Sequence, residues 1–176
     1  MSQPAASESQ TKSDFCLFER AGQRFGISTE LVREILESRP FTTVPHAPDG
    51  LLGAVSLRGE IIPLVSLDDV VGVTGRAPDR RDSILVLQEA DIRIAVIVDQ
   101  VATVRHIAPW EIRRPEQDPL PSVARGSLSI DGARTIVLDG GRLLTTIADR
   151  IIGAFRRSTN PSIAPSAPTS TCGSEE

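Results

Sequence analysis

The chain has 176 residues, which is enough for one compact domain or for two very small lobes that share a core. Its net charge is −4, and its 18 Arg and one Lys are scattered, which argues against nucleic acid or an anionic membrane surface as the main partner. Its apolar runs are far shorter than the ~20 residues that span a bilayer, so we expect no membrane insertion. Aromatic residues make up only 3%, so Val, Ile, Leu and Ala must build the core, which favours β-layers.

The two ends of the chain differ in composition from its middle. Residues 1–13 and the Ser/Thr/Pro-rich residues 158–176 have too little apolar surface to offset the entropy lost on ordering, so we expect two disordered tails. The first of these segments has no apolar stretch and does not resemble a secretory signal. Cys16 and Cys172 are expected to be reduced thiols, as in a cytoplasmic protein.

The first half of the chain begins with a hairpin pattern. Short apolar runs at residues 15–20 and 24–27 predict two strands, joined by a turn at Ala21-Gly22. After Ser28, a residue type that caps helices, apolar residues recur at helical spacing and predict a short amphipathic helix before Pro40. The apolar positions of this expected helix are Leu31, Val32, Ile35 and Leu36.

A second hairpin pattern follows a Pro-rich turn at residues 45–50. Apolar runs at 52–57 and 60–67 predict two strands that reverse at Arg58-Gly59. Pro63 has no N–H to donate, so its strand is expected to lie at a sheet edge or to bulge there. The next residues, 68–72, predict a short helical end closed by Gly72.

The second half repeats this organisation after a polar break at residues 75–82. Strands are predicted at 84–87 and 92–98, and residues 99–107 are expected to form a covering segment of mixed character. The dipeptide Asp131-Gly132 between apolar runs is the strongest hairpin signal in the sequence. Apolar residues at helical spacing then predict a C-terminal helix: Leu143, Leu144, Ile147, Ile151 and Ile152.

The hairpin–helix–hairpin pattern therefore occurs twice, with a period of about 70 residues. Each half is too short for an open sheet with a good core, and closing each half into a small barrel would remove most exposed edges. We therefore expect a mainly β protein with short helices, built from a subdomain at about 14–75 and another at about 82–157.

Residues 44–67 resemble the signature of the CheW family. That signature has a Pro-rich turn, a Gly, a hairpin with Leu-Arg-Gly at its tip, and a strand with two apolar residues before Pro. Here these features are Pro45, Gly53, Leu57-Arg58-Gly59 and Ile61-Ile62-Pro63. Residues 25–35 and 94–101 support the resemblance, which implies two five-stranded SH3-like β-barrels with a C-terminal helix over about residues 14–157.

The resemblance implies a non-catalytic cytoplasmic adaptor that uses no cofactor. Its partners would be the regulatory domain of a CheA-type histidine kinase and the cytoplasmic tip of a methyl-accepting chemoreceptor. One alternative is an adaptor of the same fold in another pathway, such as surface motility or second-messenger control. Another is a small enzyme with a site between the barrels, which would need a convergent set of titratable groups that the sequence does not reveal.

Six residues are implied to contact partner proteins: Val32, Glu34, Gly53, Leu57, Arg58 and Gly59. Arg58 offers five donors in a rigid fork, which suits carboxylates or carbonyls on a receptor helix, although from its pattern alone it is a solvated charge at a hairpin tip. The pattern alone does not separate a partner contact from an ordinary structural role for either residue of this segment: Val32 could be a core residue, and Glu34 could be a solvated charge. The glycine at position 53 is consistent both with a β-bulge and with a close approach of a partner to the backbone.

Overall fold

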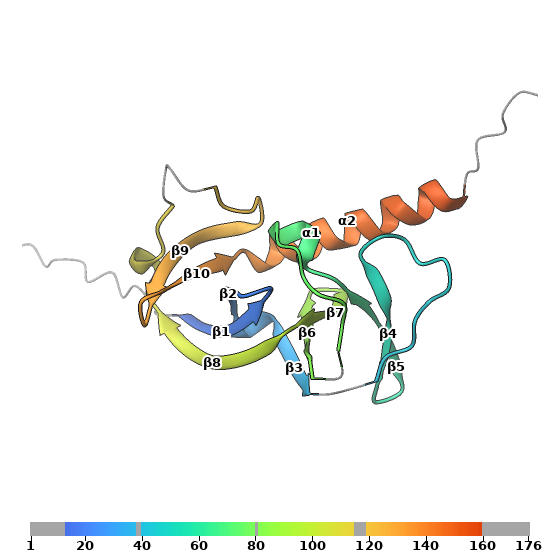
Figure 1. Ribbon diagram of the computed structural model, residues 1–176, viewed down its shortest axis with the longest axis horizontal. Coiled ribbons are helices and arrows are strands. Elements are labelled where there is room, and N and C mark those ends of the chain that lie inside the picture. Colours follow the sequence, from blue (N-terminus) through green and yellow to red (C-terminus); the bar gives the residue numbers. More distant parts are fainter. Residues whose placement is uncertain (1–12, 38–39, 80, 115–118, 160–176) are drawn as a thin grey trace, which may run out of the picture.

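The computed structural model describes residues 13–37, 40–79, 81–114 and 119–159 (Figure 1). The expected disordered tails lie outside these residues, apart from Ser13, which begins the first strand, and Ser158 and Thr159, which end the last helix. None of the helices in the described residues combines the length and the apolar character that a membrane span requires.

Two five-stranded sheets make up most of the described residues. Sheet A has the order β8-β1-β2-β10-β9 and sheet B the order β3-β6-β7-β5-β4. The strands of sheet A are β1 (Ser13–Arg20), β2 (Gln23–Ser28), β8 (Gln100–Ile107), β9 (Ala124–Ile130) and β10 (Ala133–Leu138). The strands of sheet B are β3 (Val32–Glu37), β4 (Leu51–Leu57), β5 (Glu60–Val65), β6 (Ser83–Glu89) and β7 (Ile92–Val98). The mainly β fold with two SH3-like five-stranded barrels and a C-terminal helix is therefore confirmed.

The sheets do not follow the two consecutive halves that we expected. Sheet A takes its strands from both ends of the described chain, and sheet B takes its strands from the middle. Each sheet is completed by a parallel pair, β2 with β10 in sheet A and β5 with β7 in sheet B. The expected boundary between two subdomains at residues 75–82 was wrong. Turn patterns predict only the pairing of strands that are adjacent in sequence, whereas these parallel pairs join strands that are not adjacent in sequence.

The expected helix after Ser28 is also wrong. The chain makes a single 3₁₀ turn, η1 (Thr29–Leu31), and continues directly into β3. This strand pairs antiparallel with β6, with a bulge between Val32 and Glu34. In so short a segment the helical spacing of four apolar residues is a weak signal, and pairing with β6 overrides it.

The other helical expectations agree with the structure in part. The short helix α1 (Asp68–Val71) ends at Gly72, which adopts the left-handed conformation. The C-terminal helix α2 (Gly140–Thr159) lies across both sheets (Figure 1). The expected covering segment at 99–107 is instead the edge strand β8, which is followed by a 3₁₀ turn, η2 (Pro109–Glu111).

The largest cluster of buried side chains lies between the two sheets rather than inside either one. It joins both sheets to the helices, with Phe25 of β2, Leu85 of β6, Val70 of α1 and Leu144 of α2 among its members. Smaller clusters fill sheet B and sheet A separately. Because the shared cluster removes the most apolar surface from water, it fixes the two sheets against each other.

Cys16 belongs to this shared cluster and is a free, buried thiol. Burial raises the pKa of the Cys16 thiol, because the charged thiolate is disfavoured away from water. The side chain therefore behaves as a small apolar group, and Cys172 lies outside the described residues.

A buried arginine ties sheet A to α1. Arg20, at the end of β1, is only 1% exposed, and its Nε and Nη2 donate to Asp68 Oδ1 and Oδ2 at 2.6 and 2.7 Å. Its Nη1 donates to Asp99 Oδ1 at 3.1 Å, and Asp99 also accepts the N–H of Ala21 at 2.7 Å. The hydrogen bonds to Asp68 raise the pKa of Arg20, so the guanidinium stays charged in this network.

The hydroxyl of Thr135 on β10 is completely buried and has no hydrogen-bond partner among the described residues. A Thr135→Val variant keeps the shape but removes this unsatisfied group, so we expect the free energy of unfolding to rise by about 1 kcal/mol. Urea denaturation would measure the change. The same substitution at Thr103, which is exposed on β8, should change stability by less than about 0.5 kcal/mol. Equal effects at the two positions would contradict this explanation.

Candidate protein-interaction surface

The β4–β5 hairpin presents Arg58 at its tip. Arg58 and Gly59 have φ values of 51° and 86°, and such a pair of left-handed residues forms the two-residue turn that suits the strand twist. Gly59 relieves the steric cost at its own position, while Arg58 adopts a conformation that costs an L-residue roughly 1–2 kcal/mol. The turn holds the Arg58 side chain 82% exposed to solvent.

Glu34 lies beside this tip, although on a strand rather than on the expected helix. Its Oε2 is 3.4 Å from Nη2 of Arg58, which joins β3 to the hairpin. Such an exposed ion pair contributes little to stability. Both side chains therefore remain available to a partner's charges.

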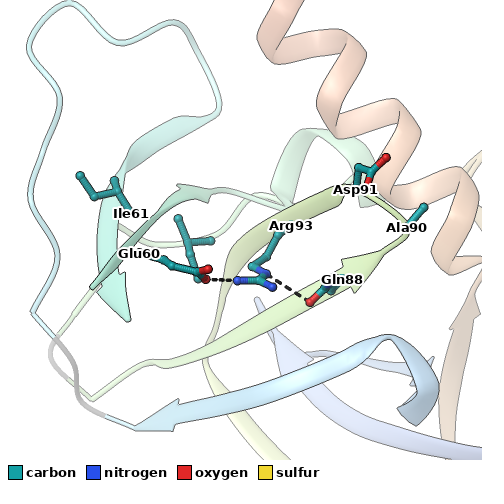
Figure 2. A pocket seen from close by; sticks show the side chains of 7 residues that line it. Glu60, Ile61, Gln88, Ala90, Asp91 and Arg93 are labelled. Atoms are coloured by element: carbon teal, nitrogen blue, oxygen red, sulfur yellow. Dashed lines mark hydrogen bonds and ion pairs between the residues drawn. The ribbon is translucent and has the colours of Figure 1, made fainter. Parts of the chain in front are cut away.

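The hairpin tip and its neighbours form an open hollow at one end of sheet B. Leu57 and Val86 are buried beneath it, and its rim carries Glu60 of β5 and Arg93 of β7. Arg93 contacts Glu60 and donates from Nε to Gln88 Oε1 at 3.2 Å (Figure 2). Five charged residues, two Glu and three Arg, therefore line the hollow around a small apolar floor: Glu34, Glu60, Arg33, Arg58 and Arg93.

Ile61 adds an apolar group to this region. It is 80% exposed, next to the fully buried Ile62, and lines a second hollow that shares Glu60 and Arg93 with the first (Figure 2). We call Glu34, Arg58, Glu60, Ile61 and Arg93 the hairpin-tip surface. An apolar residue ringed by charged ones is typical of a protein-binding surface.

The structure brings only some of the six expected residues to this surface. Glu34, Arg58 and Gly59 meet there, with Leu57 buried below. Val32 instead packs against the cluster between the sheets. Gly53 lies where the chain itself approaches closely: a Cβ there would collide with the carbonyl oxygen of Thr42 and lie 3.1 Å from Phe41.

Three residues of the surface were not expected from the sequence: Glu60, Ile61 and Arg93. The signal for Ile61 was present, because two consecutive isoleucines in a strand point to opposite faces and only one of them can enter the barrel. No local pattern predicted that Arg93 would meet Glu60, because the two residues are 33 positions apart and meet through the parallel pairing of β5 with β7.

The described residues hold no cluster of His, Cys, Asp and Glu suited to a metal ion. Cys16 and Arg20, whose pKa values are raised by burial and by the hydrogen bonds to Asp68 respectively, are buried in β1 and do not line the hairpin-tip surface. The hairpin-tip surface carries charges of both signs and an exposed apolar side chain.

Comparison with known proteins gives a consistent family. The model of the CheW-like domain matches residues 14–148. The chain is 33% identical over 118 residues to "Chemotaxis protein CheW" of Rhizobium meliloti, covering 65% of this chain and 76% of that protein. It is 31% identical over 135 residues to "Probable chemotaxis protein CheW" of Rhizobium etli, covering 74% and 86%.

A solved structure shares the fold. The scaffolding protein TtCheW from Thermoanaerobacter tengcongensis superposes with a TM-score of 0.64 at 22% identity, over 77% of this chain and 90% of that one. This likeness concerns the arrangement of the barrels alone. Because the family model spans most of the chain and relatives above 30% identity align over most of their length, the chain belongs to the CheW family.

Proposed function

We propose that this chain is a non-catalytic adaptor that couples chemoreceptors to a CheA-type histidine kinase in bacterial chemotaxis, and that it acts in the cytoplasm. Membership of the CheW family supports the role. The observation that carries the proposal is the display of Arg58 on a two-residue turn, 82% exposed and beside Glu34 at the end of a barrel.

The geometry suits docking against a helical receptor tip. The guanidinium of Arg58 can donate to carboxylates or carbonyls, and Glu34 and Glu60 can accept from basic groups. Ile61 supplies exposed apolar area beside these charges. Because β3, β5 and the two-residue β4–β5 turn fix the backbone of these groups, little backbone ordering entropy is lost on binding.

The test is a charge reversal at the hairpin tip. We expect Arg58→Glu to weaken binding to a receptor-tip fragment by about tenfold or more, since an attractive charge becomes a repulsive one. Isothermal titration calorimetry with the full chain would measure this change, and a separate titration with a CheA regulatory domain would test the kinase contact. Thermal unfolding of the variant should match wild type, because the side chain is exposed.

A matched control is Arg142→Glu, which reverses an arginine that is 62% exposed on α2 and does not line either hollow of the hairpin tip. Binding should be unchanged in this variant. Failure of the wild-type chain to bind either partner would reject the adaptor role. Intact receptor binding by Arg58→Glu would reject only the assignment of the hairpin-tip surface.

A further inference from the structure

On the outer face of α2, Ile152 lies between two opposite charges. Asp149, Ile152 and Arg156 follow one another at spacings of three and four, so they lie on one face of the helix. All three are exposed, and Ile152 is 50% exposed. The opposite face packs into the cluster between the sheets through Leu144 and its neighbours.

The two charged side chains on this face have no partner within the described part of the chain. The side chains of Asp149 and Arg156 make no ion pair or hydrogen bond with another described residue. Gly153, adjacent to Ile152, is inside the helix, where glycine costs about 1 kcal/mol relative to alanine. A glycine at this position leaves room for another helix to approach closely.

The order of these residues is self-complementary. If two copies of this helix pair antiparallel, with the two-fold axis passing between Ile152 and Gly153, each Asp149 lies opposite the other copy's Arg156. Each Ile152 then lies against the other copy's Gly153. Both charge pairs and both apolar contacts repeat by two-fold symmetry, as an isologous interface requires.

We propose that two copies of this chain associate weakly through antiparallel pairing of the C-terminal halves of α2. This inference goes beyond the adaptor role and does not depend on it. The contact involves only a few helical turns, so it belongs with interfaces too small for a permanent dimer. It would be populated mainly where neighbouring copies are held at high local concentration.

The position of α2 leaves both surfaces free at once. Figure 1 shows α2 along one side of the molecule, with α1 and the start of β4 beside it. The β4–β5 tip lies at the other end of these strands, because residues 51 and 65 are paired near α1. Pairing through α2 would therefore not block the hairpin-tip surface.

Charge reversals on the full chain test the proposal. We expect Asp149→Arg alone, or Arg156→Asp alone, to raise the dissociation constant of the dimer by about tenfold or more, because both ion pairs become repulsive. The double variant Asp149→Arg/Arg156→Asp restores both pairs and should regain wild-type association. An equimolar mixture of the two single variants should also regain it. Sedimentation equilibrium up to millimolar concentration would report the mean mass against the 18.9 kDa monomer.

Two results would overturn the proposal. The first is a mean mass that stays at the monomer value for the wild-type chain at every concentration. In that case, binding to phosphatidylglycerol vesicles that Arg156→Asp weakens would assign the face to a lipid surface instead. The second is self-association that the single reversals leave unchanged, or that the double variant does not recover. Circular dichroism of each variant would verify that α2 is intact.

Discussion

Replacing Arg20 with methionine is expected to lower the free energy of unfolding by about 3–5 kcal/mol. The Arg20 side chain is 1% exposed, and its guanidinium forms ion pairs with a carboxylate of α1 and with one from the turn between β7 and β8. Without it, Asp68 and Asp99, which are 18% and 26% exposed, would lose the guanidinium that pairs with both carboxylates. Urea denaturation followed by far-UV circular dichroism would measure the loss.

Two further variants separate this explanation from a general effect of removing arginine. Arg24→Met on β2 removes a partly exposed arginine whose nearest carboxylate oxygen, on Glu19, is 3.4 Å away, and should cost less than about 1 kcal/mol. Arg20→Lys keeps the charge but cannot reproduce the forked hydrogen bonds to Asp68, so an intermediate loss is expected. Equal losses in Arg20→Met and Arg24→Met would contradict the role assigned to the network.

The second large effect is expected at Gly53. Gly53→Ala places a Cβ against the backbone carbonyl of Thr42, which bonds to the N–H of Ala54 at 2.8 Å. The backbone must shift to make room, so we expect the free energy of unfolding to fall by about 1–3 kcal/mol. The same substitution at Gly59 meets no atom within 4 Å and is disfavoured only by its positive φ.

Binding measurements on the Gly53→Ala variant distinguish two reasons for this glycine. If the glycine serves only the fold, the variant should bind receptor tip with near wild-type affinity at temperatures where it is folded. A variant that keeps its stability but loses binding would show that a partner, rather than Thr42, needs the space. Calorimetric titration combined with urea denaturation reads out both quantities on the same protein.

Local signals in the sequence predicted the hairpins well. Turns at Ala21-Gly22, Arg58-Gly59 and Asp131-Gly132 all lie between antiparallel strands, because each pairs a left-handed position with glycine. The amphipathic pattern from Leu143 onward predicted α2 for a similar reason, since it extends over several turns. Signals of this type depend only on neighbouring residues.

Pro63 shows where local reasoning reached only part of the answer. Its strand, β5, is not at the edge of sheet B, yet its pairing with β7 begins only at Leu64. The missing N–H of Pro63 therefore falls on a stretch of β5 that lacks this second neighbour. The expectation that Pro63 lacks a ladder partner on one side was right. The expectation that its strand lies at the edge of the sheet was wrong.

The candidate site was predictable only where it coincides with the hairpin. Arg58 and Gly59 follow from turn chemistry and from the family resemblance. Arg93 joins the surface through the parallel pairing of β5 with β7, which no turn specifies. Val32 is partly buried instead, because β3 turns its side chain against the cluster between the sheets.

The split origin of sheet A also has a consequence for synthesis on the ribosome. The β1–β2 hairpin emerges first, but its sheet neighbours β8 and β10 are made only after all of sheet B. Until then Phe18 and Phe25 lack the part of their cluster that comes from β10 and α2, so the nascent hairpin presents apolar surface for several seconds at ordinary elongation rates. Sheet B, whose five strands are contiguous in sequence, can form its strand pairings in that interval. The β1–β2 hairpin can then pack against sheet B before the rest of sheet A is synthesised.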